Sequence, residues 1–143
     1  MAGEVTVDIT HRFERGAEVR ASLARTIAPG SILVLFGPSG AGKTTILRAI
    51  AGLLRPDRGR IVCDGHDWFD ASADRFMPPQ ERRVGYVAQD TALFPHLTVR
   101  ANIEYGLRAA PAEARRQRAG ELIQLVGARG LEDRLPRQLS GGQ

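Results

Sequence analysis

The stretch GPSGAGKTT at residues 37–45 constrains this chain more than any other stretch. It matches the phosphate-loop pattern GxxxxGK[ST] at every specified position. The apolar run SILVLF at 31–36 precedes it and predicts a short parallel strand that is buried on both faces. Residues 44–54 follow it, and their apolar side chains recur at helical spacing. A strand, a glycine-rich turn and a helix in this order are the context that the pattern requires.

The geometry of such a turn suits the phosphates of a nucleotide. Glycines let successive backbone N–H groups point inward at phosphate oxygens, at the positive end of a helix. Lys43 can then reach the β- and γ-phosphates, and the hydroxyl of Thr44 suits Mg²⁺. Lys43 is the only lysine of the chain, and a compact ammonium fits under phosphates where a planar guanidinium does not. The candidate phosphate-binding residues are Gly37, Pro38, Ser39, Gly40, Ala41, Gly42, Lys43, Thr44 and Thr45.

The composition is that of a soluble globular domain, with 143 residues, 43% hydrophobic and 25% charged. The net charge of +4 is spread over arginines interleaved with acids, which predicts solvated faces and no nucleic-acid partner. The single cysteine, Cys63, excludes an internal disulfide. No run approaches the ~20 apolar residues that span a bilayer, and the N-terminus does not resemble a signal peptide. We therefore expect a cytoplasmic chain that meets a membrane only through a partner.

Polar and apolar residues alternate at 4–10 and at 19–27, which predicts two antiparallel strands joined by a turn. Phe13 lies in that turn, where it either stacks on an adenine ring or packs at the strand end. Residues 60–63 predict another strand, and 68–80 predict an irregular surface segment that ends in two prolines.

The run VGYVA at 84–88 predicts a strand that delivers Gln89 at its carboxyl end, where ligand-contacting residues of open α/β sheets collect. A solvated glutamine at a strand end is the alternative interpretation. Residues 91–98 predict a loop with exposed apolar side chains, which either pack on a neighbouring helix or form a docking patch.

The remaining chain predicts two helices, at 99–107 with Thr98 as the cap and at 111–126 with Gly127 as the stop. We therefore interpret residues 1–143 as one domain. It would comprise a β-rich phosphate-loop core at 1–90, a helical subdomain at 91–138 and a terminal motif at 139–143.

Three motifs in this order resemble the ATP-binding subunit of ABC transporters: the phosphate loop, YVAQD at 86–90 and LSGGQ at 139–143, the signature of that family. The resemblance implies an α/β P-loop NTPase core with an N-terminal antiparallel β piece and a helical subdomain. It also implies an ATPase that couples ATP binding and hydrolysis to solute import. Residues 78–107 look most like molybdate importers, with importers of sulfate, polyamines, sugars or iron as alternatives. A DNA-maintenance or ribosome-associated relative is disfavoured, because the motifs leave no room for a coiled-coil insertion.

The resemblance also implies roles for single residues. Lys43, Gln89 and Ser140 would take part in catalysis, and Gln89 would contact Mg²⁺ and the attacking water. Thr44 would be a second Mg²⁺ ligand, and Phe13 falls near the adenine-stacking aromatic of the family.

Partners follow from the same resemblance. Two copies would close head to tail around two ATP molecules, so that Ser140, Gly141 and Gly142 contact the γ-phosphate held by the other copy. The loop from Leu93 to Val99 would face a cytoplasmic helix of the membrane permease. The chain would then lie on the inner face of the cell membrane.

The chain departs from the family after its signature motif. The family continues with a helix, an apolar strand that ends in an aspartate and a catalytic glutamate, and a histidine, and none of these is in the sequence. We therefore expect a part of a full ATPase, with a non-catalytic nucleotide-binding short form as the alternative. These residues alone would bind ATP weakly and hydrolyse it at background rate. The run 31–36 would lack a neighbouring strand and form an unpaired apolar edge that promotes aggregation.

Overall fold

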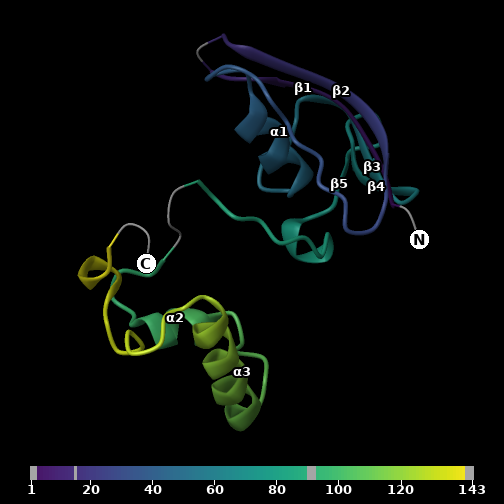
Figure 1. Ribbon diagram of the computed structural model, residues 1–143. Coiled ribbons are helices and arrows are strands. Elements are labelled where there is room, and N and C mark those ends of the chain that lie inside the picture. Colours follow the sequence, from purple (N-terminus) through teal and green to yellow (C-terminus); the bar gives the residue numbers. More distant parts are fainter. Residues whose placement is uncertain (1–2, 15, 90–92, 141–143) are drawn as a thin grey trace. The chain divides into compact units, whose positions relative to one another are not determined.

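The computed structural model describes residues 3–14, 16–89 and 93–140. The chain forms two compact units, Met1–Val87 and Ala88–Gln143. All the described strands belong to the first unit, and the described part of the second unit is helical (Figure 1). No helix in these described ranges is both long enough and apolar enough to cross a membrane.

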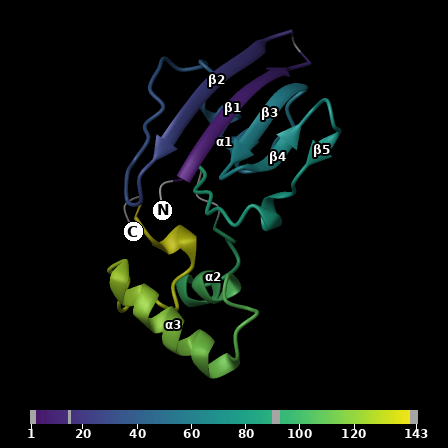
Figure 2. The same cartoon turned by 90° about the vertical axis from the view of Figure 1, so that its right-hand side faces the viewer.

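The first unit is built on an antiparallel sheet. Strands β1 (Gly3–Arg12) and β2 (Glu18–Ile27) form a hairpin whose register runs from Gly3 opposite Ile27 to Arg12 opposite Glu18. This confirms the hairpin that the alternating pattern predicts. Figure 2 shows the strands side by side in the order β2-β1-β3-β4-β5. The three further strands are β3 (Arg58–Cys63), β4 (His66–Asp70) and β5 (Arg75–Phe76).

Helix α1 (Lys43–Ile50) packs on this sheet and closes the core of the first unit. Ala49 of α1 is fully buried together with four sheet residues, Val7, Ile9, Ile61 and Phe69. The sequence predicts a helix as far as residue 54, but α1 ends at Ile50. The physical reason is Gly52, whose left-handed φ of 77° turns the chain away from the helix axis.

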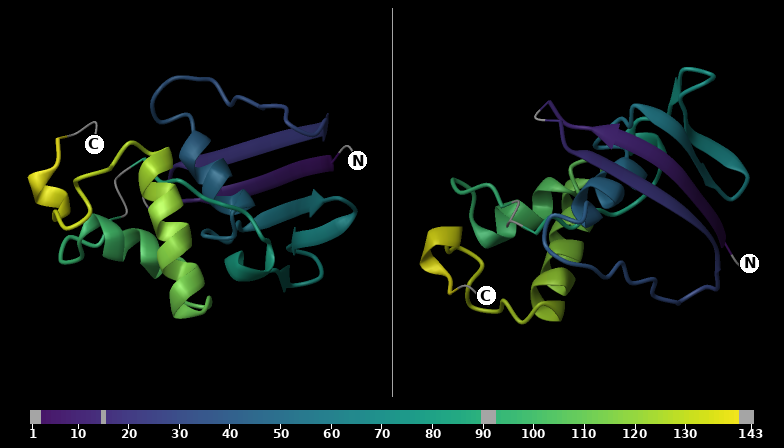
Figure 3. Two further views of the ribbon diagram at one scale, coloured as in Figure 1. Left: turned by 60° about the horizontal axis from the view of Figure 1, so that its bottom comes forward. Right: turned by 90° about the horizontal axis from the view of Figure 1, so that it is seen from above.

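Two predicted strands do not form among the described residues. The prediction of a buried strand at 31–36 is wrong, because Ile32, Val34 and Phe36 are 87%, 72% and 98% exposed. Figure 3 shows this segment as part of a loop between β2 and α1. The run 84–88 is likewise outside any strand. A buried parallel strand needs neighbours supplied by distant segments, and no described segment pairs with either run.

The prediction of an irregular segment at 68–80 is also wrong in part. Residues 66–76 form the hairpin of β4 and β5, and only a short 3₁₀ turn, Pro79–Glu81, follows it. The strand pattern is obscured in the sequence by charged residues that the sheet pairs across strands. Asp67 of β4, for example, accepts a hydrogen bond of 2.6 Å from Arg60 Nε of β3.

The second unit contains helices α2 (Val99–Tyr105) and α3 (Ala112–Leu125), followed by a 3₁₀ turn at Pro136–Gln138. The hydroxyl of Thr98 accepts a hydrogen bond of 3.2 Å from Ala101 N, which confirms the predicted cap of α2. Asn102 holds the loop before this helix, since its side chain bonds the backbone of Phe94 and Leu97. The sequence predicts that Leu93, Phe94 and Leu97 of this loop either pack on a neighbouring helix or form a docking patch. Phe94 is half-buried and packs on Tyr105 of α2, with ring centroids 4.3 Å apart, which agrees with the first alternative. Leu97 is also half-buried, and Leu93 is exposed.

Candidate nucleotide-binding site

The phosphate loop forms a glycine-dependent turn that leads directly into α1. Gly42 is the N-cap of α1 and has a left-handed φ of 85°. A Cβ at this position would lie 2.5 Å from Val19 Cγ1, so no larger residue fits here without displacement. Gly40 is also left-handed, with a φ of 79°, but the space around it is open. The turn therefore presents an unobstructed backbone to solvent at the N-terminus of the helix.

Lys43 is held over this turn by backbone oxygens. Its Nζ donates hydrogen bonds to Gly37 O at 2.9 Å and to Pro38 O at 2.6 Å. Residues 31–54 contain no acidic side chain, so no carboxylate within this stretch competes for the ammonium. The first-turn N–H groups of a helix have no intrahelical acceptor. A positive charge, unpaired amides and a turn without bulky side chains together fit a polyphosphate group.

Thr44 and Thr45 lie in the first turn of α1, where Thr44 is exposed and Thr45 is half-buried. A hydroxyl in this place is suited to Mg²⁺, which keeps most of its waters. The described residues contain no group of three or more His, Cys, Asp or Glu side chains that could hold a metal ion. The residues around Thr44 therefore fit an ion that arrives with a phosphate rather than a metal bound by the protein alone.

Phe13 lies in the β1–β2 turn and is 40% exposed. It lines an open hollow of about 660 Å³ together with His11, Arg12, Glu14 and Ala17. The His11 ring meets Phe13 edge to face, with ring centroids 4.8 Å apart. Such a pair leaves one face of the aromatic ring available for stacking on a planar ligand.

The strand register places this turn beside the phosphate loop. Val19 of β2 pairs with His11 of β1. Val19 is also the residue against which Gly42 is packed. The hollow and the phosphate turn therefore share one neighbouring strand residue, Val19.

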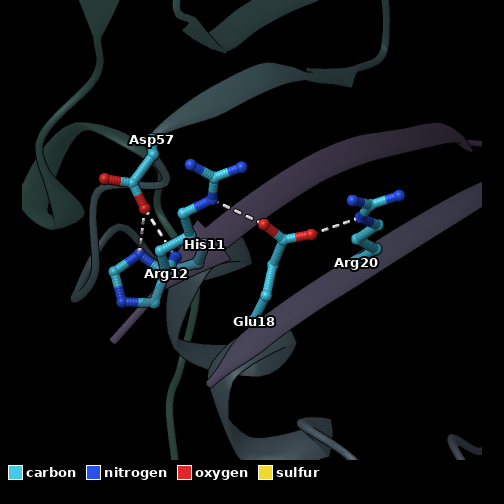
Figure 4. Close-up of polar contacts among 5 residues, drawn as sticks. All are labelled: His11, Arg12, Glu18, Arg20 and Asp57. Atoms are coloured by element: carbon cyan, nitrogen blue, oxygen red, sulfur yellow. Dashed lines mark hydrogen bonds and ion pairs between the residues drawn. The ribbon is translucent and has the colours of Figure 1, made fainter. Parts of the chain in front are cut away.

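Two carboxylates hold His11 and Arg12, which line the hollow, and Figure 4 shows these polar contacts. Asp57 Oδ2 accepts a hydrogen bond of 2.7 Å from Arg12 N and lies 3.0 Å from His11 Nδ1. The Arg12 amide and the nearby imidazole hold the pKa of Asp57 below its ordinary value. Glu18 accepts from Arg12 Nε at 2.5 Å and from Arg20, and these bonds lower the pKa of Glu18. Both carboxylates are therefore ionised at neutral pH and orient the side chains around Phe13.

The remaining predicted site residues belong to the second unit. Gln89 lies in an exposed bend, and Ser140 is exposed after the final 3₁₀ turn. Gly141 and Gly142 lie outside the described residues. Within the first unit, Val19 pairs with His11 and also packs against Gly42, and the roles of Phe13, Gln89 and the signature motif stay predictions.

Sequence reasoning missed His11 and Asp57 as parts of this site. They lie about half of the first unit apart along the chain, and neither belongs to a recognisable motif. Their association depends on the pairing of β3 with β1, which brings Asp57 beside the end of β1 and bonds its N–H to Thr10 O at 3.0 Å. No local sequence pattern predicts a contact that depends on the pairing of two distant strands.

The glycine turn and the lysine at the start of α1 are the features of a phosphate-loop nucleotide-binding domain. A family model described as "ABC transporter" matches residues 21–143, and the chain belongs to this family. The solved structure of the ATP-binding cassette MJ0796, a dimer bound to ADP and Pi, is similar with a TM-score of 0.76 and 28% identity. That likeness covers 99% of this chain and 64% of the cassette.

Curated relatives cover most of this chain. The molybdenum import ATP-binding protein ModC of Paramagnetospirillum magneticum is 43% identical over 137 residues, which are 96% of this chain and 37% of the relative. ModC of Rhodospirillum rubrum is 44% identical over 96% of this chain and 36% of the relative. The sulfate/thiosulfate import ATP-binding protein CysA of Thermosynechococcus vestitus is 50% identical over 82% of this chain and 34% of the relative. The chain spans little more than a third of the length of these relatives.

Proposed function

We propose that this chain is the nucleotide-binding part of an ATPase subunit that drives import of molybdate or another oxyanion through a membrane permease. The observation that carries the proposal is the position of Lys43, held over an open glycine turn at the N-terminus of α1. The 43% identity to a molybdenum import ATP-binding protein over 96% of the chain supports the transport role.

In this proposal the residues of the first unit bind and orient ATP. Lys43 exchanges the carbonyl oxygens of Gly37 and Pro38 for oxygens of the β- and γ-phosphates, and its charge offsets theirs. The first-turn amides of α1 donate to the same phosphates, and the Thr44 hydroxyl is a ligand of the accompanying Mg²⁺. Phe13 stacks on the adenine ring in the hollow beside it.

Hydrolysis and transport require groups beyond this site. We assign Gln89 to the contact with Mg²⁺ and the attacking water, and Ser140, Gly141 and Gly142 to the γ-phosphate bound by a second copy. The dimeric state of the similar cassette MJ0796 supports such a pairing. The loop from Leu93 to Val99 would contact the permease, which would hold the subunit on the cytoplasmic face of the membrane.

Binding of ATP to matched variants tests this proposal. Lys43→Ala should weaken ATP binding about a hundredfold, because the phosphates lose a close cationic partner. Arg48→Ala, an exposed change later in the same helix, is the control and should bind like the unaltered chain. Phe13→Ala should weaken binding of ATP about tenfold and leave binding of inorganic triphosphate unchanged, since only the stacking contact is lost. Equal affinities for Lys43→Ala and the unaltered chain would refute the phosphate role.

The sulfate/thiosulfate relative supports sulfate as a second candidate cargo. Molybdate and sulfate are both tetrahedral dianions, and the nucleotide site contacts neither. Uptake of labelled molybdate and of labelled sulfate by cells with and without the gene separates the candidates. Loss of molybdate uptake alone is the result we expect. ATP turnover with and without the co-expressed permease then tests the remaining alternative, a non-catalytic nucleotide-binding chain.

A further inference from the structure

The side chain of Arg82 is buried and is not explained by the nucleotide site. It is 3% exposed and is the only polar or charged residue that is buried in the described ranges. No ion pair joins it to a carboxylate among those residues. Its guanidinium instead donates to four backbone oxygens. These are Ala49 O at 2.7 Å, Ile50 O at 2.8 Å, Met77 O at 2.8 Å and Trp68 O at 3.0 Å.

Two of these four acceptors lie at the carboxyl end of α1. The last carbonyls of a helix have no intrahelical donor and form the negative end of the helix dipole. A guanidinium satisfies this end well, because its planar donors bond Ala49 O and Ile50 O together while its charge offsets the dipole. Burial lowers the pKa of Arg82, but arginine stays charged in a protein. The carbonyl oxygens therefore stabilise a buried cation without a counter-ion.

The surroundings of this guanidinium allow little movement. Its Cζ lies 5.5 Å from the ring centroid of Trp68 and 5.2 Å from that of Phe76, which are cation–π distances. A Cβ at Gly52 would lie 2.8 Å from Arg82 Nε, so only glycine leaves room for this side chain. Arg82 thus joins the end of α1 to β4 and β5 in one fixed geometry.

The position of Arg82 in the chain links this contact to the candidate site. Helix α1 is eight residues long and begins with Lys43, so its carboxyl end is only about 12 Å from the phosphate turn. Arg82 itself begins the segment that leads to Gln89. A shift of this segment would therefore act on the helix that carries Lys43.

We propose that Arg82 is a positioning residue for nucleotide binding, which clamps the carboxyl end of α1 so that Lys43 and the first-turn amides keep the orientation that phosphates need. The predicted effect of Arg82 on ATP affinity rests on the proposed function. The predicted effect of Arg82 on the order of α1 does not require a nucleotide, so affinity and order are measured separately.

The experiment compares Arg82→Lys and Arg82→Met with Arg83→Lys and Arg83→Met in the full chain. Arg83 is the matched control, because it is the next residue and is exposed. Amide hydrogen exchange is measured for Ala51 and Leu53, which bond Leu47 O and Arg48 O at the end of α1, and for Val7 and Ile9 in the sheet. Affinity for ATP is measured on the same samples, with Lys43→Ala as the binding-deficient reference.

We expect Arg82→Met to raise exchange at Ala51 and Leu53 roughly tenfold more than at Val7 and Ile9, the effect of losing about one net hydrogen bond at that end. ATP affinity should also fall about tenfold, because the same hydrogen bonds at the end of α1 are lost. Arg82→Lys should restore part of both effects, since an ammonium keeps the charge but cannot bond all four carbonyls. Both Arg83 variants should match the unaltered chain.

Other outcomes overturn the proposal. Equal acceleration in α1 and the sheet would make Arg82 a general stabiliser with no positioning role. Unchanged exchange and affinity in folded Arg82→Lys would do the same, and this variant decides the question if Arg82→Met does not fold. Absence of ATP binding in the unaltered chain would refute the proposed function instead, and the exchange pattern would then decide the α1 clamp by itself.

Discussion

The sheet and the apolar run at 31–36 belong to the same unit, yet they use apolar side chains in opposite ways. Val7, Ile61 and Phe69 of the sheet are 0% exposed, whereas Phe36 of the run is 98% exposed. The sheet strands are joined largely by short hairpins, so each strand finds a partner close in the chain. A parallel strand needs a partner from a distant segment, and the run at 31–36 has none among the described residues. Hydrophobicity alone does not bury a segment, because a strand also needs hydrogen-bonding neighbours.

The largest expected difference in stability is between one substitution in the sheet and one in the run at 31–36. Phe69→Ala should lower the free energy of unfolding by about 3–5 kcal/mol, because it opens a cavity in a closed core. Phe36→Ala is the matched control and should change it by less than about 0.5 kcal/mol. Urea unfolding followed by circular dichroism measures both. A loss at Phe36 similar to that at Phe69 would mean that the run is packed in solution.

A second pair of variants compares a glycine of the sheet with one of the phosphate loop that follows the run at 31–36. Gly59→Ala in β3 should cost about 2–3 kcal/mol, because its Cβ would lie 1.9 Å from Asp8 O and its φ is 98°. Gly40→Ala in the phosphate loop has a similar φ of 79° but no atom within 4 Å, so it should cost only about 1 kcal/mol. Thermal unfolding of both variants gives the difference. Equal costs would show that the backbone angle, and not the close approach of β1 and β3, decides the effect.

The smallest expected effect concerns pH. The folded-state pKa of Asp57 is lowered, chiefly by the hydrogen bond from Arg12 N, so its contribution to stability is present above its unfolded pKa of about 4 and is lost as pH falls through the lower folded value. Asp57→Asn should therefore be less stable than the unaltered chain at pH 7, and this difference should shrink below about pH 4. Residues 31–54 contain no acidic side chain, so we expect no such response from the run at 31–36 or the phosphate loop.

Unfolding curves between pH 2.5 and 7 measure this change, a range chosen to extend about one unit or more on either side of the unfolded pKa. Asp8→Asn on β1 is the control, because the Asp8 side chain has no hydrogen bond or ion pair among the described residues. A constant difference between Asp57→Asn and the unaltered chain over the whole range would contradict the assigned role of the Asp57 carboxylate.

Much of the fold is predictable wherever the deciding interactions are local. The β1–β2 hairpin follows from alternation of polar and apolar residues, and the start of α2 follows from Thr98. The strands β4 and β5 are missed because cross-strand charge pairs such as Arg60 with Asp67 interrupt the apolar pattern. The run at 31–36 is predicted as a strand from its apolar residues, and the family resemblance predicts that it lacks a neighbouring strand. Among the described residues it is exposed and unpaired, and it does not form the strand itself.

The sequence by itself determined the phosphate turn of this member of the ABC transporter family, because a glycine that needs a left-handed φ and a lysine directly after it are specified by local spacing. Only the tertiary structure decided what supports that turn. Arg82 bonds the end of α1 at Ala49 and Ile50, which lie 33 and 32 positions before it in the chain. Asp57 reaches Arg12 across 45 positions. Contacts over such separations depend on how the strands pair, and no short stretch of sequence encodes them.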